Sequence, residues 1–301
     1  MGENTAGMAL DAAGIASAGG GLSVVGTPIG NLGDFSPRAA QTFAAADLIC
    51  CEDTRVTAKL LAHAGISKPL MRLDEHVIAA RTPDLIARMQ AGERIAFASD
   101  AGMPAISDPG QVLVDAAREA DVPVDVIPGP SACVTALVAS GIACDHFFFE
   151  GFLPRKTGER QRRLERLATV PGALVFYESP HRVASTLDTI AAVFPGRVAA
   201  LCRELTKLHE EVLRAEAVEL AELVHERGEL RGEMVVVVAP PAADEDVVLP
   251  VVAEDPDEAL RRDVAEALAA GEPASGIAKR LSQRYSRRRR DVYHLVLELQ
   301  G

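Results

Sequence analysis

Short apolar segments and amphipathic segments alternate along most of this chain, and this alternation constrains the fold more than any other feature. Apolar runs typical of buried strands occupy 22–26, 47–53, 71–75, 94–98 and 122–129. Helical patterns lie between or after them, at 36–46, 55–65, 82–92, 111–120 and 130–141, with Ser36 and Thr82 as expected N-caps and Pro37 at a first helical position. Because the connecting loops are short, the pattern predicts a parallel α/β sheet over residues 21–145.

The second half of the chain continues the pattern and then changes character. Strands are expected at 172–180, 197–205 and 232–240, with helices at 181–194 and 217–228, which gives a second α/β domain over 146–243. Residues 244–256 form an acidic, proline-containing linker, and three short helices are expected within 257–301. The predicted class is therefore α/β, with two α/β domains and a small C-terminal helical domain resembling a helix-turn-helix module. Residues 1–20, rich in Ala and Gly, are expected to be a flexible lead-in.

Composition excludes several classes of protein. The 301 residues contain no apolar run long enough for a transmembrane helix, and the N-terminus lacks the basic start and apolar block of a signal peptide. The five cysteines, at positions 50, 51, 133, 144 and 202, show neither CxxC nor Cys/His metal spacing. We therefore expect buried reduced thiols, no metal site and a cytoplasmic location.

Unusual loops follow four of the expected strands, where parallel sheets place their ligands. They are GTPIGNLGD (26–34), CEDTR (51–55), SDAGMPAISDPG (99–110) and PGPSA (128–132). Neither GxGxxG nor GxxxxGK[ST] occurs, so the usual cradle for a pyrophosphate is missing and a nicotinamide dehydrogenase is disfavoured. The loops instead offer glycines, small hydroxyls and carboxylates. The hydroxyls are those of Thr27, Ser107 and Ser131, and the carboxylates are those of Asp53, Asp100 and Asp108. This chemistry suits an amine-bearing or cationic ligand without phosphates, such as S-adenosylmethionine.

A set of motifs in fixed order carries a family resemblance. The four loops are followed by FFFEGFLPRK, FYESPHR, RELTKLHEE and RGEMVVVV. Over about 21–301 the chain resembles the tetrapyrrole-methylase superfamily (class III methyltransferases). Within it, the resemblance is to enzymes that methylate the ribose 2′-hydroxyl of a cytidine in the decoding region of small-subunit ribosomal RNA. The resemblance implies a homodimer and S-adenosylmethionine bound between two α/β domains.

The resemblance also implies which residues hold the cofactor. From the first domain they are Thr27, Pro28, Asp100, Ala101, Gly102, Met103, Ser131 and Ala132, and from the second Phe176, Tyr177, Glu233, Met234 and Val235. Asp100 is expected to supply an acceptor, and the segments from the second domain are expected to cover adenine. The sequence SDAGMP stands where small-molecule relatives have a Gly-Asp-Pro type sequence, so their contacts are not transferred in detail.

Transfer of a methyl group from a sulfonium to a hydroxyl needs positioning and a proton acceptor, but no metal. We favour Glu178 and Asp53 as the base or as groups that orient it, with Arg55 holding the nucleotide. Other ionisable groups of the same motifs, which salt bridges or solvent exposure would also explain, are Glu52, His76, His181, Glu204 and His209.

Basic residues gather in two stretches although the net charge is −12. Residues 154–166 and 279–290 are rich in Arg and Lys, and the second stretch contains no acidic residue. Such stretches hold phosphates and make RNA binding dependent on salt, although a solvated helix face would look the same. The expected RNA-binding residues are Arg155, Lys156, Arg160, Arg162, Arg163, Arg182, Arg203, Lys207, Lys279, Arg280, Arg287, Arg288, Arg289 and Arg290. Few aromatic residues are present for base stacking, so we expect recognition of an assembled ribosomal particle.

Two other classes of function stay open on the sequence. A methylase of a tetrapyrrole or another small molecule would share the fold but would not need the basic stretches. A non-catalytic nucleic-acid-binding protein would not need the SDAGMPAISDPG loop.

Overall fold

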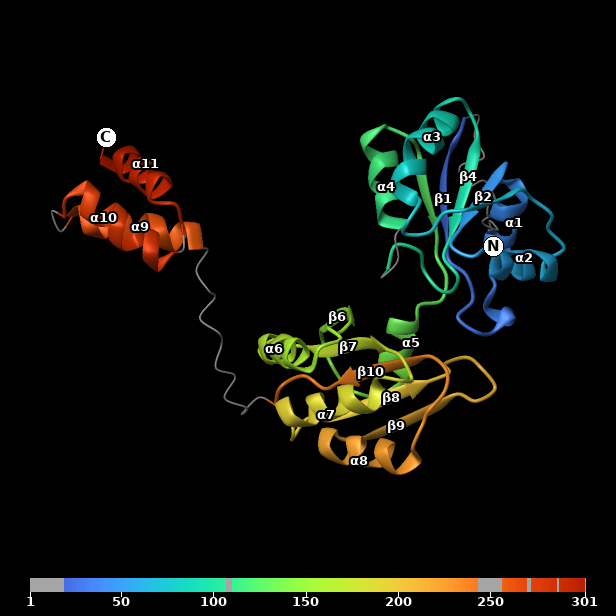
Figure 1. The fold of residues 1–301 in the computed structure, drawn as a ribbon. Helices are drawn as coiled ribbons and strands as arrows, with labels where there is room; N and C mark the ends of the chain where they lie inside the picture. Colours follow the sequence, from blue (N-terminus) through green and yellow to red (C-terminus); the bar gives the residue numbers. More distant parts are fainter. Residues whose placement is uncertain (1–18, 107–109, 243–255, 270–271, 286, 301) are drawn as a thin grey trace, which may run out of the picture. The chain divides into compact units, whose positions relative to one another are not determined.

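The computed structural model describes residues 19–106, 110–242, 256–269, 272–285 and 287–300 (Figure 1). The chain divides into two compact units, Met1–Ala243 and Asp244–Gly301. The lead-in expected at 1–20 and the linker expected at 244–256 fall almost wholly outside the described residues, as do Ser107 and Asp108.

A parallel sheet of five strands forms the first half of the larger unit, as the alternation of segments predicts. Its spatial order is β3-β2-β4-β1-β5, and every neighbouring pair is parallel. The order places the loops after β1 and β4 side by side at the carboxyl edge of the sheet. The strands are β1 (Gly21–Val25), β2 (Leu48–Cys51), β3 (Leu70–Arg72), β4 (Arg94–Ala98) and β5 (Val124–Ile127).

Helices cover both faces of this sheet because its strands are apolar on both sides. On one face, Phe43 of α1 (Pro37–Ala45) and Leu61 of α2 (Thr54–His63) pack on the strands. On the other, Leu85 of α3 (Ile78–Gln90) and Leu113 of α4 (Gly110–Glu119) do so. The Ser36 hydroxyl accepts a hydrogen bond from the Ala39 N–H, which confirms the expected cap of α1.

The second sheet is mixed rather than parallel. Its order is β6-β7-β10-β8-β9, in which only β6 and β7 run parallel. Helices α6 (Thr157–Leu167), α7 (Val183–Val193) and α8 (Ala217–Arg227) pack on one face. The strands are β6 (Phe147–Phe152), β7 (Ala173–Glu178), β8 (Val198–Arg203), β9 (Glu211–Glu216) and β10 (Met234–Val238).

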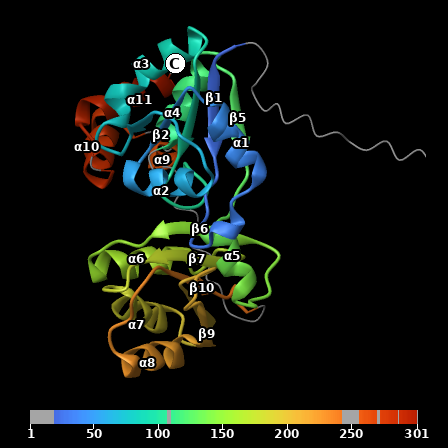
Figure 2. The ribbon, with the colours of Figure 1, turned by 90° about the vertical axis from the view of Figure 1, so that its right-hand side faces the viewer.

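Helix α5 (Ala132–Ala139) packs on the opposite face of the second sheet, although the sequence pattern places it in the first domain. Its buried residues Cys133 and Ala136 belong to the same core as Val175 and Val235. Figure 2 shows α5 beside the strands of the second sheet. The helix therefore begins at the edge of the first sheet and ends in the core of the second. This arrangement brings the loop after β5 close to both sheets.

One local expectation needs correction, and three elements were not predicted. Helix α3 begins at Ile78 rather than at Thr82, because Asp74 accepts the first bonds of the turn and the Thr82 hydroxyl donates back to the Ile78 carbonyl. Strands β6 and β9 and helix α6 are regular elements that the sequence pattern does not predict. Strand β6 carries a bulge between Phe149 and Gly151, and α6 is so rich in charge that its pattern resembles a basic loop.

The C-terminal unit contains the three expected helices, α9 (Pro256–Ala269), α10 (Ala274–Arg284) and α11 (Arg289–Gln300). They share a core of their own, formed by Leu260, Val264, Ile277, Leu281, Val292 and Val296. The Tyr285 hydroxyl donates to Asp263 at 2.7 Å and ties the end of α10 to α9.

Candidate functional site

The loop after β4 is fastened to the loop after β1. Thr27 and Gly102 exchange backbone hydrogen bonds of 2.9 and 3.1 Å, which form a short antiparallel bridge beyond the ends of the parallel strands. Gly102 has φ of 82°, a conformation that glycine adopts without strain. The Thr27 side chain is buried and turned toward the Ser99 carbonyl. The bridge fixes the backbone of residues 100–103 at the sheet edge.

Met103 packs where two loops approach closely. A Cβ atom on Gly26 would lie 2.7 Å from Gly129, so only glycine permits this contact between the loops after β1 and β5. The Gly129 N–H points at the Met103 sulfur at 3.2 Å. Met103 therefore joins the loops after β1, β4 and β5 into one wall.

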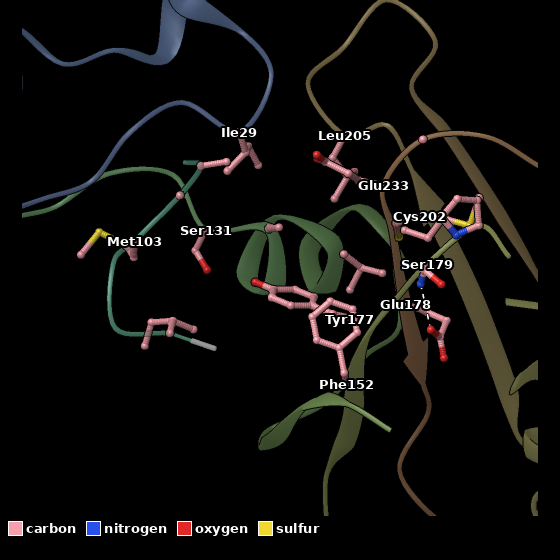
Figure 3. Close-up of a pocket in the computed structure, with 18 residues that line it drawn as sticks. Ile29, Met103, Ser131, Phe152, Tyr177, Glu178, Ser179, Cys202, Leu205 and Glu233 are labelled. Atoms are coloured by element: carbon pink, nitrogen blue, oxygen red, sulfur yellow. Dashed lines mark hydrogen bonds between the residues drawn. The ribbon is translucent and has the colours of Figure 1, made fainter. Parts of the chain in front are cut away.

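A cavity of about 390 Å³ lies against this wall, and side chains near the ends of β7, β8 and β10 complete it (Figure 3). Its volume falls within the range of about 300–1,000 Å³ that is usual for small-molecule sites. The lining is mainly apolar, with Ser131, Tyr177, Glu178, Ser179 and Glu233 as polar residues. The rings of Phe152 and Tyr177 meet edge to face with centroids 5.8 Å apart.

Most of the sequence-predicted cofactor residues meet in this cavity. Those that line it are Ala101, Gly102, Met103, Ser131, Ala132, Tyr177, Glu233, Met234 and Val235, together with Glu178. Four do not. Phe176 points into the opposite core, because neighbours on a strand face opposite sides, and Thr27 is buried below the bridge. Pro28 and Asp100 are absent from the lining.

Lining residues that the sequence analysis did not name are Ile29, Ile106, Phe152, Ser179, Pro180, Cys202, Leu205 and Gly232. They lie within motifs already quoted. Most of their side chains are apolar, so nothing in the sequence distinguished them from core residues.

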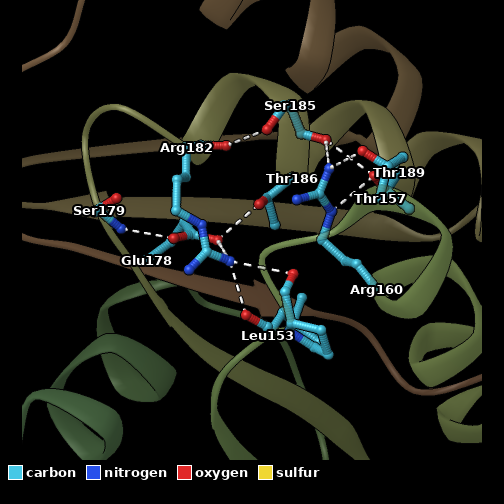
Figure 4. A network of polar contacts seen from close by, with 10 residues as sticks. Leu153, Thr157, Arg160, Glu178, Ser179, Arg182, Ser185, Thr186 and Thr189 are labelled. Atoms are coloured by element: carbon cyan, nitrogen blue, oxygen red, sulfur yellow. Dashed lines mark hydrogen bonds and ion pairs between the residues drawn. The ribbon is translucent and has the colours of Figure 1, made fainter.

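Glu178 does not have the surroundings of a catalytic base. Its side chain is fully buried, and its carboxylate accepts hydrogen bonds from the Ser179 N–H (2.8 Å) and the Thr186 hydroxyl (2.7 Å). Arg182 lies 3.3 Å from the same carboxylate and donates to the carbonyl of Leu153 at 2.7 Å (Figure 4). Both carboxylate oxygens therefore tie β7 to α7 and to the segment after β6, which favours a structural role, and the role of Glu178 as the base stays a prediction.

Asp53 is also poorly suited to accept a proton. It caps α2, and its carboxylate binds the guanidinium of Arg55 with two contacts at 2.6 and 3.0 Å. The hydrogen bonds from Arg55 hold the pKa of Asp53 well below its usual value. Asp100 stands next to it and accepts a 2.9 Å hydrogen bond from the Asp53 N–H. Burial raises the pKa of Asp100 above its usual value.

Some of the basic residues expected to bind RNA are anchored within the protein. Arg160 is buried and donates to Thr189 and to the Ser185 carbonyl, so its assignment to RNA is wrong, because a solvent-facing phosphate cannot reach it (Figure 4). Acidic side chains or backbone carbonyls also hold Arg163, Arg182, Arg203, Lys207 and Arg280.

The other residues of the expected RNA-binding set are exposed. They are Arg155, Lys156, Arg162, Lys279, Arg287, Arg288, Arg289 and Arg290. Arg288 lies one residue before α11, where its carbonyl accepts hydrogen bonds from the N–H groups of Asp291 and Val292. The backbone of Arg288 therefore begins the helix. Their contact with RNA stays a prediction.

The described residues contain neither a cluster of metal-ligating side chains nor a helix able to span a membrane. No group of three or more His, Cys, Asp or Glu side chains there is arranged to hold a metal ion. No helix in that part of the chain is both long and apolar enough to cross a membrane.

The fold and the cavity define a class of methyltransferase. The model of the tetrapyrrole (corrin/porphyrin) methylases matches residues 21–221. The solved structure of the methyltransferase CobJ superimposes with a TM-score of 0.57 at 20% identity, covering 73% of this chain and 94% of that one. The structure of uroporphyrin-III C-methyl transferase from Thermus thermophilus, solved with S-adenyl homocysteine, superimposes with a TM-score of 0.52 at 18% identity. The match covers 73% of this chain and 97% of that one.

Curated sequences narrow the class. A protein of Synechocystis sp. named ribosomal RNA small subunit methyltransferase I is 43% identical over 93% of this chain and 98% of its own length. The protein of the same name from Xylella fastidiosa is 46% identical over 75% of this chain and 84% of its own. The chain therefore belongs to the ribosomal RNA small subunit methyltransferase I family, whose methyl donor is S-adenosylmethionine.

Proposed function

We propose that this chain transfers the methyl group of S-adenosylmethionine to the ribose 2′-hydroxyl of a cytidine in the decoding region of small-subunit ribosomal RNA. The observation that carries the proposal is one cavity of suitable size and lining in a chain that belongs to this family. A small-molecule methylase has only fold similarity at 13–23% identity in its favour.

The cavity fits the cofactor chemically. Tyr177, Phe152 and Val235 supply apolar cover for a flat base. Ser131 begins α5 without a side-chain cap bond, so its hydroxyl and the N–H groups of the first turn can serve the ligand. Glu233 offers a carboxylate that is 76% exposed; Lys207 binds its Oε2 atom at 3.2 Å, and the other oxygen suits an ammonium group. When bound, S-adenosylmethionine supplies a methyl group on a positively charged sulfur.

The acceptor and its setting are inferred from surface charge and from the thiols. The exposed basic residues of α6 and of the α10–α11 region would contact phosphates of an assembled particle. The chain as a whole carries a net charge of −12, so these basic residues are locally concentrated. The five cysteines are unpaired, which supports a reducing cytoplasm.

A homodimer is part of the same proposal. The side chains of Val134 and Val138 lie one turn apart on α5 and are 49% and 77% exposed, whereas Cys133 and Ala136 of the same helix are buried in the core of the second sheet. An apolar face of this kind supports contact with a second copy. Sedimentation of the wild type and of Val138→Glu tests the contact. A monomeric wild type would refute it.

The function itself is tested by methyl transfer. Tritiated S-adenosylmethionine is incubated with assembled small subunits and with naked small-subunit RNA from a strain lacking the enzyme. The methylated residue is then mapped by its resistance to alkaline cleavage. Label at a cytidine 2′-oxygen is expected, more in particles than in naked RNA. Label on no RNA would refute the proposal.

A further inference from the structure

A second hollow adjoins the cavity described above at the loop after β4. It measures about 480 Å³ and is lined by Glu52, Asp53, Thr54, Arg55, Arg72 and Asp100. Asp100 lines this hollow, and its sequence neighbour Ala101 lines the cofactor cavity. The loop after β4 therefore borders both spaces.

Resting on the proposed function, we propose that this hollow receives the acceptor nucleoside and that Asp100 takes the proton of its hydroxyl. The site contains residues from the ends of β2, β3 and β4, and so it opens at the carboxyl edge of the first sheet. A nucleotide there must leave its base stack, as substrates of base-directed enzymes do.

The charges of the hollow suit a neutral nucleoside better than a phosphate. Two arginines face three carboxylates within it. Arg55 and Arg72 are each anchored on one aspartate, Asp53 and Asp74, while their side chains stay 86% and 70% exposed. Anchored guanidinium planes can stack on a base, and their free N–H groups can donate to its acceptors. The carboxylates can accept hydrogen bonds from an amino group or from ribose hydroxyls.

A third hollow adjoins the second through Arg72 and has the opposite charge balance. It measures about 370 Å³ and is lined by Arg72, Asp74, His76, Val77 and Arg81. Two arginines face one carboxylate in it. A phosphate next to the acceptor nucleoside fits this basic neighbour, so the two hollows together form a short track for the RNA chain.

Asp100 is placed for the proton transfer that the reaction needs. One of its oxygens accepts from the Asp53 N–H, and the hydroxyl can approach the other. As the O2′–CH₃ bond forms, the carbon–sulfur bond breaks and its electron pair stays on sulfur. The hydroxyl proton passes to the Asp100 carboxylate. Burial favours the protonated form of Asp100, and this raised pKa makes it a stronger base than Asp53.

Three variants test the assignment. Arg72→Ala removes the residue shared by both hollows. Arg94→Ala is its matched control, because Arg94 is also an exposed arginine anchored on an aspartate, Asp47, but lies at the opposite end of the same sheet. Asp100→Asn keeps the size of the side chain and removes the base. Each variant is compared with the wild type by thermal unfolding before use, and Arg72→Gln replaces Arg72→Ala should the latter fail to fold.

The readouts separate cofactor binding, particle binding and chemistry. Calorimetry gives the Kd for S-adenosylmethionine, filter binding gives the Kd for unmethylated small subunits, and tritium transfer gives kcat and KM. Arg72→Ala should raise the particle Kd and the KM at least tenfold, with the cofactor Kd within twofold. Arg94→Ala should change none of them. Asp100→Asn should lower kcat at least a hundredfold with both Kd values within threefold.

Other outcomes overturn the inference. If Arg72→Ala behaves as Arg94→Ala does while the wild type methylates RNA, the hollow is not the acceptor site and the proposed function stands. If Asp100→Asn weakens the cofactor tenfold, Asp100 belongs to the cofactor cavity after all. A wild type that labels no RNA refutes the proposed function and this site with it.

Discussion

Replacing Glu178 by Gln separates a structural carboxylate from a catalytic one. The amide has the same shape but no charge, and its NH₂ group cannot accept the hydrogen bond that a carboxylate oxygen accepts. One of the donors from Ser179, Thr186 or Arg182 therefore loses its acceptor in a place where the Glu178 side chain has no contact with water.

The size of the effect follows from these contacts. A buried donor left without a partner costs about 1–3 kcal/mol. The ion pair with Arg182 adds about 1 kcal/mol or less, because the arginine side chain is 23% exposed and water screens the attraction. We expect a loss of about 2–3 kcal/mol in the free energy of unfolding, or roughly 5–10 °C in Tm for a unit of this size.

Calorimetric melting and methyl transfer at 20 °C, where the variant stays folded, measure the two roles. A structural role predicts the lower Tm, a kcat within tenfold of the wild type and an unchanged pH profile. Thr186→Val is the matched control, because it removes one of the same bonds from a residue outside the cavity lining. A kcat reduced by about 10²–10⁴ at an unchanged Tm would show that Glu178 is the base after all.

Three further perturbations have defined outcomes. Gly26→Ala should abolish cofactor binding in calorimetry, because its Cβ would lie 2.7 Å from the loop after β5; ordinary binding would show that this loop yields. Arg94 lowers the pKa of Asp47 to about 2, so Asp47 adds stability above its ordinary pKa of 3.8 that is lost as the pH falls through 2. Asp47→Asn should therefore cost at most about 1 kcal/mol in urea unfolding at pH 7, and the difference should shrink below pH 4; a constant difference would contradict the linkage. Iodoacetamide at pH 8 should modify Cys144 first in a mass-spectrometric time course. Cys144 is partly exposed, whereas burial raises the pKa of Cys202 to about 12. Early labelling of Cys202 would mean that the reagent enters the cavity and that the Cys202 thiol ionises there.

The backbone plan could be predicted because it depends on local pattern. The Ser36–Pro37 cap and the apolar strands of the first sheet are encoded within a few residues. The second sheet was harder to predict from the sequence. Pairing of β9 with β8 buries little of β9, so its sequence lacks a clear alternation, and the destination of α5 depends on a core formed much later in the chain.

The site could be predicted by segment but not by side-chain direction. The motifs identified the loops that meet at the cavity, yet Phe176 and Tyr177 are neighbours and only Tyr177 faces it. The sequence suggested a catalytic role for Glu178 because it is a carboxylate in FYESPHR, a motif with several ionisable residues. Its role depends on the partners that α7 brings to it, and no spacing in the sequence reveals them.

The separate core of the C-terminal helices has an evolutionary consequence. Leu260, Ile277 and Val296 belong to a core that residues of the C-terminal unit form among themselves. Substitutions in these helices can therefore accumulate without disturbing the geometry of methyl transfer. A lineage can therefore lose or exchange this module while the larger unit stays under its own selection.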